Sequence, residues 1–215
     1  MSTPQPTSTS TPTSYTLLSL GDSYTIGETV SEQERWPVQL AARLSQESLH
    51  VAPPRILAQT GWTTDELAQA IANQEPLGQY DLVTLLIGVN NQYRGWSLDT
   101  CTREFGQLLA TAGQACTQGA SGVIAVSIPD WGVMPFAKDR DVVQIARDID
   151  DFNAAQRQVC QDLDITWIDI TTSSRNVAEH PEWIASDGLH PSGAMYQSWC
   201  EIILPIAKRK LSDRK

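Results

Sequence analysis

The sequence has few basic residues, and it lacks an apolar stretch of the roughly 20 residues needed to cross a bilayer. Its 15 Lys and Arg residues are outnumbered by 25 Asp and Glu, which gives a formal net charge of -10 at pH 7. Such a field repels nucleic acid and anionic membrane surfaces. We therefore expect no nucleic-acid partner and no stable membrane insertion. The one basic run, Lys208-Arg209-Lys210, falls at the end of a predicted helix, where it suits the helix dipole.

Cysteine is also scarce, with four in the chain. Cys101 and Cys116 lie near opposite ends of one predicted helix, roughly 20 Å apart at about 1.5 Å per residue, which is beyond disulfide reach. Cys160 and Cys200 fall on separate predicted helices without a spacing typical of metal sites. We therefore predict free thiols in a reducing compartment.

Residues 1–14 consist only of Met, Ser, Thr, Pro and Gln. They have neither the charged nor the apolar segment of a signal peptide, so we expect a cytoplasmic protein, with secretion by another route as the alternative. They also bury too little apolar surface to order themselves. The sequence thus predicts a disordered Ser/Thr/Pro tail at 1–14, followed by one domain at 15–215.

Strand and helix signals alternate along that domain. The apolar runs at 82–87 and 123–126 are typical of strands covered on both faces, and Trp36, Leu40 and Leu44 recur at helical spacing. Strands are predicted at 15–20, 55–58, 81–87, 122–127 and 165–169, and helices from about 36 and over 63–71, 100–117, 141–163 and 193–210. This alternation predicts an α/β fold with a parallel sheet between layers of helices.

Short polar motifs follow the predicted strands, at the edge where ligands bind in such sheets. Gly21-Asp22-Ser23 comes directly after the first strand, where a helix should begin. Ser23 taken alone is best interpreted as a helix N-cap. The functional alternative is a nucleophile activated by a neighbouring base. Asp22 is interpreted as a turn-forming residue.

Two further motifs offer hydrogen-bond donors to a developing oxyanion. Gly61 follows the second strand, and its backbone N–H has no side chain to block approach, although a permissive turn is the simpler role. The Ser23 amide is a second donor. Asn90 ends the third predicted strand and offers its side-chain NH2, with an Asx turn as the alternative. Asn91 is interpreted as structural.

Near the C-terminus, Asp187 and His190 lie three residues apart, and Pro191 biases the segment toward an exposed loop. Asp187 can reach His190 Nδ1 and leave Nε2 free to act as a base. An ordinary surface turn is the alternative. His50 and His180 are weaker candidates, because neither has a carboxylate at a useful short spacing.

Taken together, these motifs resemble the SGNH hydrolases, also called the GDSL esterase/lipase family, over essentially all of residues 15–210. The resemblance rests on Gly21-Asp22-Ser23, Gly61, Gly88-Val89-Asn90 and Asp187-Gly188-Leu189-His190. It implies a three-layer α/β/α sandwich with a flavodoxin-like, five-stranded parallel sheet. It also implies that Ser23, Asp187 and His190 form a catalytic triad, and that the Ser23 amide, Gly61 and Asn90 form an oxyanion hole.

The sequence departs from the family pattern at two positions. Tyr24 stands where Leu is frequent, and Asn91 replaces an Asp often found after Asn90. The chain also lacks the Gly-x-Ser-x-Gly elbow of the α/β-hydrolases, because position 25 is Thr25.

These motifs predict a serine esterase that hydrolyses carboxylic esters through an acyl-serine intermediate, without metal or cofactor. Carbohydrate deacetylation, acyl transfer and lysophospholipase activity are the alternatives, and a non-catalytic binding module is disfavoured by the full set of motifs. Bulky residues in loops beside the motifs are predicted to bind substrate: Trp62, Tyr93, Trp131, Met134 and Phe136. Residues 128–136 contain too many Pro and Gly residues for helix or strand. We expect small or monomeric acyl esters as substrates.

Overall fold

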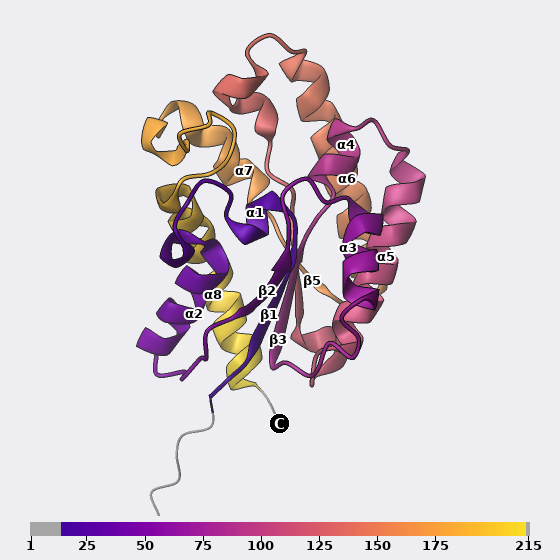
Figure 1. Ribbon diagram of the computed structural model, residues 1–215, viewed down its shortest axis with the longest axis vertical. Helices are drawn as coiled ribbons and strands as arrows, with labels where there is room; N and C mark the ends of the chain where they lie inside the picture. Colours follow the sequence, from indigo (N-terminus) through magenta and orange to yellow (C-terminus); the bar gives the residue numbers. More distant parts are fainter. Residues whose placement is uncertain (1–13, 214–215) are drawn as a thin grey trace, which may run out of the picture.

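The centre of the protein is a sheet of five parallel strands (Figure 1). The computed structural model describes residues 14–213, so the predicted tail lies outside the described residues except for Ser14. The strand order β2-β1-β3-β4-β5 is that of flavodoxin-like folds, which confirms the predicted fold class. The strands are β1 (Leu17–Gly21), β2 (Arg55–Ala58), β3 (Leu82–Leu86), β4 (Val123–Val126) and β5 (Thr166–Ile168).

Helices cover both faces of this sheet, which makes the three layers visible in Figure 1. Successive strand residues point to opposite faces: Leu17 joins the core under α2 and α8, whereas Leu18 joins the core under α3 and α5. Both faces are therefore apolar, as the continuous apolar runs require. The helices are α1 (Ser23–Ile26), α2 (Trp36–Gln46), α3 (Thr64–Ala72), α4 (Val89–Tyr93), α5 (Leu98–Gln114), α6 (Val142–Asp162), α7 (Thr171–Ser174) and α8 (Gly193–Ser212).

The longer helices follow the predicted pattern. Trp36, Leu40 and Leu44 are fully buried, so the stripe at helical spacing does face the sheet. The capping box also forms, because the Thr63 N–H donates to the Glu66 carboxylate at 2.9 Å at the start of α3. Within residues 14–213, none of the helices is long and apolar enough to cross a membrane.

Two short elements near the carboxyl edge differ from the prediction. Asn90 does not end a strand: β3 stops at Leu86, and Asn90 lies in the first turn of α4. Residues 128–136 include two 3-10 turns, Trp131–Val133 and Pro135–Ala137. The first turn is capped by Asp130, whose carboxylate accepts from the Gly132 N–H at 2.9 Å. Elements of three to five residues are too short to produce a periodic sequence signal.

Cys101, Cys160 and Cys200 are free thiols, as predicted, and all four cysteines are buried. Burial raises the pKa of the Cys101 thiol to about 11 and the pKa values of Cys160 and Cys200 to about 12. Because thiolates are the reactive form, these side chains are inert packing groups at neutral pH.

Candidate active site

Ser23 is the first residue of α1, directly beyond the carboxyl end of β1. The N-cap of this helix is Asp22, whose carboxylate Oδ1 accepts from the Tyr24 N–H at 3.0 Å. The capping role considered for Ser23 therefore belongs to its neighbour, which leaves the Ser23 hydroxyl available. Gly21 permits the tight junction, because a Cβ there would lie 2.5 Å from the Leu86 carbonyl oxygen.

Asp22 also has unusual electrostatics. Its Oδ2 atom is buried and has no hydrogen-bond partner within residues 14–213. Burial raises the pKa of the Asp22 carboxyl to about 7, although the hydrogen bond from the Tyr24 N–H opposes this change. Asp22 therefore caps the start of α1, and its carboxyl group stays protonated to a higher pH than that of an ordinary Asp.

Asp187 and His190 form a close pair in the loop before α8. The Asp187 Oδ2 atom lies 2.5 Å from His190 Nδ1, and Oδ1 accepts from the backbone N–H groups of Leu189 and His190 at 3.0 and 2.9 Å. Partial burial raises the pKa of Asp187, but these hydrogen bonds outweigh it and hold that pKa below its usual value. An ionised Asp187 favours the tautomer of His190 with the proton on Nδ1, which leaves Nε2 as an acceptor.

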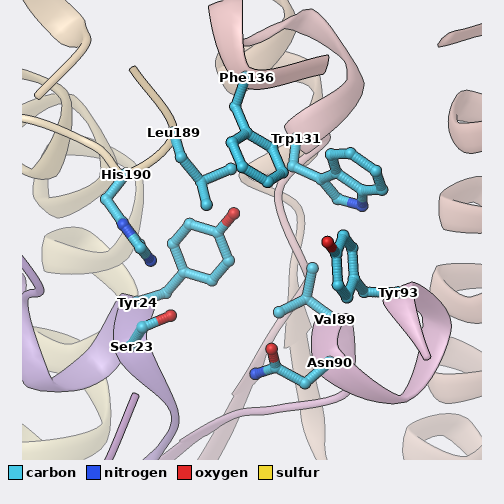
Figure 2. Close-up of a pocket in the computed structure, with 9 residues that line it drawn as sticks. All are labelled: Ser23, Tyr24, Val89, Asn90, Tyr93, Trp131, Phe136, Leu189 and His190. Atoms are coloured by element: carbon cyan, nitrogen blue, oxygen red, sulfur yellow. The ribbon is translucent and has the colours of Figure 1, made fainter. Parts of the chain in front are cut away.

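The His190 loop lies against the Ser23 helix. The Tyr24 ring packs on the His190 imidazole with centroids 5.7 Å apart. Figure 2 shows the Ser23 hydroxyl and the outer edge of the His190 ring on the same side of one cavity. Ser23 and His190 are 167 positions apart in the sequence, and they contribute a hydroxyl and an imidazole to the lining of one cavity.

Asn90 lines the same cavity, whereas Gly61, the other predicted oxyanion donor, is not among its lining residues. The Asn90 amide Nδ2 donates to the Trp62 carbonyl oxygen at 3.0 Å, which fixes the orientation of the amide and leaves its second N–H unused. Figure 2 shows the Asn90 amide nitrogen directed toward the side of the cavity where Ser23 lies. Gly61 has a φ of 87°, a left-handed conformation that favours glycine.

Asn91 faces away from the site, as interpreted from the sequence. Its side chain is fully buried, where Oδ1 accepts from the Thr64 N–H at 3.1 Å and Nδ2 donates to the Thr64 hydroxyl at 2.8 Å. Asn91 therefore ties α4 to the start of α3. This is a structural role, and it positions the neighbouring Asn90.

An apolar cavity of about 200 Å³ adjoins Ser23 and His190. Three of the five predicted substrate-binding residues, Tyr93, Trp131 and Phe136, line it (Figure 2). Met134 is not among the lining residues, and its side chain packs in the core. Trp62 does not line it either, and its ring packs against the core on the α3 side.

Three further residues line the cavity: Tyr24, which the sequence singles out as a departure from the family pattern, and Val89 and Leu189, which were not predicted. Each is the immediate neighbour of Ser23, Asn90 or His190 in sequence. Because the three polar residues lie in short helices or turns, a neighbouring side chain reaches the same cavity. A position next to a candidate catalytic residue was therefore the sequence feature that could have identified these lining residues. In particular, the departure from the family pattern at Tyr24 alters the cavity wall.

The two other histidines lie elsewhere. The His50 carbonyl pairs with the Tyr15 N–H at the opposite end of the sheet. His180 does have a carboxylate partner, contrary to expectation, because Glu182 Oε1 lies 3.1 Å from its Nδ1. That pair is exposed and outside the cavity, and the His180 ring stacks on Trp183.

A flavodoxin-like sandwich with polar side chains gathered beyond the carboxyl ends of its strands is an α/β protein whose ligand is expected at that edge of the sheet. The chain belongs to the GDSL-like lipase/acylhydrolase family, whose model matches residues 19–198. The protein is accordingly a hydrolase that acts on a small-molecule substrate. No curated protein sequence matches the chain at a significant level.

Several solved structures share the fold of this chain. A lipase/acylhydrolase from Enterococcus faecalis is 20% identical, with a TM-score of 0.69 over 94% of this chain and 99% of the other. A member of the lipolytic G-D-S-L family from Veillonella parvula is 16% identical, with a TM-score of 0.70 over 90% and 98%. An acetylxylan esterase from Geobacillus stearothermophilus is 17% identical, with a TM-score of 0.64 over 93% and 95%. At these identities, the likeness shows the shared fold.

Proposed function

We propose that the protein is a serine esterase that cleaves carboxylic esters through an acyl-Ser23 intermediate. The observation that carries this proposal is the Asp187–His190 pair, at 2.5 Å, in a loop that shares one cavity with Ser23 and Asn90. The residues needed for acyl transfer thus come from three separate segments of the chain. A binding module has no need for this combination.

In the proposed first step, His190 Nε2 takes the proton from the Ser23 hydroxyl as Oγ attacks the ester carbonyl. Negative charge then develops on the carbonyl oxygen. It receives hydrogen bonds from the backbone N–H groups of Ser23 and Gly61 and from the unused N–H of Asn90. Asp187 stabilises the positive charge that forms on His190.

The intermediate then collapses as the bond to the leaving oxygen breaks. His190 donates its proton to that oxygen, which releases the alcohol and leaves an acyl-enzyme at Ser23. In the second half, His190 takes a proton from water, whose oxygen attacks the acyl carbon. Ser23 leaves as its hydroxyl is restored, and the carboxylic acid departs.

The size and lining of the cavity support small or monomeric acyl esters as substrates. Its volume of about 200 Å³ is below the roughly 300–1,000 Å³ of sites for drug-sized ligands. The side chains beside Ser23 are chiefly aromatic and aliphatic, so they favour an apolar acyl or alcohol group. The buried free thiols of Cys101, Cys160 and Cys200 support a cytoplasmic location, which cell fractionation tests.

A substrate screen tests the proposal. Purified protein is assayed with p-nitrophenyl esters of increasing acyl length, acetylated xylo-oligosaccharides and lysophospholipids, each beside the Ser23→Ala variant. We expect hydrolysis of short p-nitrophenyl esters that disappears in the variant. Hydrolysis confined to acetylated sugars or lysophospholipids would favour carbohydrate deacetylation or lysophospholipase activity, and formation of a new ester with an added alcohol would favour acyl transfer.

A second assay tests the preference for monomeric esters. The rate is followed as the concentration of a short triglyceride passes its solubility limit. We expect the rate to rise and saturate below that limit, without a jump when aggregates form. A sharp increase on aggregation, with negligible turnover of dissolved ester, would identify an interfacial lipase and contradict this preference.

A further inference from the structure

The aromatic wall of the cavity carries a cation that the proposed reaction does not use. Tyr93, Trp131 and Phe136 contact one another, with ring centroids 5.3 to 6.5 Å apart. The Arg140 guanidinium carbon lies 5.3, 5.8 and 5.5 Å from the centroids of the Tyr93, Trp131 and Phe136 rings. One guanidinium group therefore caps three of the side chains that line the cavity.

Arg140 lies over the outer, solvent-exposed end of this wall. Trp131 is 4% exposed, whereas Tyr93 and Phe136 are 46% and 42% exposed, so the wall opens toward solvent at these two rings. An Arg140 Nη2 N–H donates to the Tyr93 hydroxyl at 3.1 Å. The rings and this hydrogen bond hold the planar group in one orientation against the aromatic wall.

Most of the hydrogen-bonding capacity of Arg140 remains unused. A guanidinium has five N–H donors, and one is directed at Tyr93. Among residues 14–213, no ion pair within 4.0 Å includes Arg140, although Arg43, Arg94, Arg103 and Arg175 all have carboxylate partners. The flanking Asp141 is occupied as the N-cap of α6, where it accepts from the Gln144 N–H at 3.0 Å.

The aromatic contacts and the remaining N–H donors of Arg140 together suit the binding of an anion. The aromatic rings displace water from part of the guanidinium, which strengthens its attraction to an opposite charge. The planar donor fork matches the two oxygens of a carboxylate. An ester bound at Ser23 that extends along the aromatic wall would bring its far end toward Arg140.

From this arrangement we infer that Arg140 is a specificity-determining residue that selects esters carrying a carboxylate beyond a short apolar segment. The inference rests on the proposed ester hydrolysis and narrows its substrate class. The carboxylate belongs to either the acyl or the alcohol part of the ester. In both cases the apolar segment lies on the aromatic wall, and the carboxylate pairs with the guanidinium.

The test compares matched esters that differ in one charge. For the acyl side, mono-p-nitrophenyl glutarate is compared with p-nitrophenyl pentanoate, in which a methyl group replaces the carboxylate. For the alcohol side, p-acetoxyphenylacetate is compared with its amide. Each pair is assayed with the wild type, Arg140→Gln and Arg140→Lys. The control Arg103→Gln makes the same change in net charge on α5, away from the cavity.

We expect Arg140→Gln to lower kcat/KM for the anionic member of one pair by roughly tenfold or more, the usual effect of a hydrogen-bonded charge pair. The neutral member should change by less than about threefold. Arg140→Lys should keep part of the preference, because it retains the charge but not the fork. Arg103→Gln should alter neither member of a pair selectively. Added salt should weaken the wild-type preference.

Equal losses for the charged and neutral esters would overturn the inference, because Arg140 would then only support the aromatic wall. Unchanged selectivity in Arg140→Gln would also overturn it. Failure of the proposed function is a separate result: no wild-type hydrolysis of any ester in the two pairs. In that case calorimetric titration with glutarate monoethyl ester still decides the inference. Binding that weakens in Arg140→Gln supports an anion subsite, and equal or undetectable binding in both proteins contradicts it.

Discussion

The guanidinium of Arg94 donates a hydrogen bond to the carbonyl oxygen of Gly61 at 2.7 Å. Arg94 is the C-cap of α4 and is also 3.4 Å from the Glu66 carboxylate, which in turn caps α3 at Thr63. The hydrogen bond from the Thr63 N–H is the main reason that the pKa of Glu66 is lowered, so this carboxylate stays ionised. The backbone at Gly61 is thereby held between the ends of two helices.

We therefore predict that Arg94 positions the Gly61 N–H for catalysis. Arg94→Gln should lower kcat by about threefold to tenfold with little change in KM, because a charge-assisted hydrogen bond to an exposed loop is lost. Steady-state kinetics on a p-nitrophenyl ester measure this separation. Arg103→Gln serves as the control, and an effect on KM alone would assign Arg94 to substrate binding instead.

Asn90 should make the larger contribution to the oxyanion hole. Asn90→Ala is expected to lower kcat by roughly 10²–10³-fold, the usual loss for one oxyanion donor, with a smaller change in KM. Asn91→Ala is the matched control. Asn91 makes its hydrogen bonds to Thr64 in the interior, so its loss should chiefly lower the free energy of unfolding, by about 1–3 kcal/mol. If Asn90→Ala mainly raises KM, Asn90 is a binding residue.

The sequence was sufficient to predict the sheet and the longer helices, because each buries a regular apolar pattern. The strands β3 and β4 are buried at every position and apolar except at Thr84, and the Trp36–Leu40–Leu44 stripe has helical spacing. It was also sufficient to indicate which polar residues gather at one edge of the sheet. Parallel strands end at the same edge, so residues after β1 and β3 must lie near each other.

The details of the cavity wall were less predictable from sequence. Met134 and Phe136 are two residues apart in the same broken segment, yet Met134 is 3% exposed and Phe136 is 42% exposed. Which of them turns inward depends on two 3-10 turns, set by the Asp130 cap and by Pro135. Similarly, Arg140 contacts three rings that come from two separate segments of the chain. Contacts between distant segments leave no local pattern in the sequence.

The raised pKa of Asp22 predicts that the stability of the protein depends on pH. Burial raises its pKa from 3.8 to about 7, so between these values the unfolded chain releases a proton that the folded protein retains. This group therefore makes the folded protein less stable as pH rises from about 4 to about 7, by a total of a few kcal/mol. Asp22→Asn removes this titration but keeps an acceptor for the Tyr24 N–H. Its unfolding temperature should decline less over that interval than that of the wild type. Parallel slopes in both proteins would contradict the raised pKa.

The rate should also depend on pH, because His190 must be unprotonated to act as the base. We expect kcat/KM to rise from acidic toward neutral pH. Asp187 does not limit this rise, since its hydrogen bonds hold its pKa below the usual value and keep it ionised throughout the interval. Asp22 titrates in the same interval, so the profile is repeated with Asp22→Asn. A rise that persists in the variant supports His190, whereas a rise that disappears assigns it to Asp22.

The most direct test of the proposed function is the site of covalent modification. The protein is treated with a fluorophosphonate that reacts with activated serines, and the adduct is located by peptide mass spectrometry. We expect one adduct per chain, at Ser23, with loss of ester hydrolysis. Ser23→Ala should neither react nor hydrolyse esters, while its circular dichroism and unfolding temperature remain those of a folded protein. An adduct at another serine, or a Ser23→Ala variant that retains the wild-type rate, would contradict Ser23 as the nucleophile.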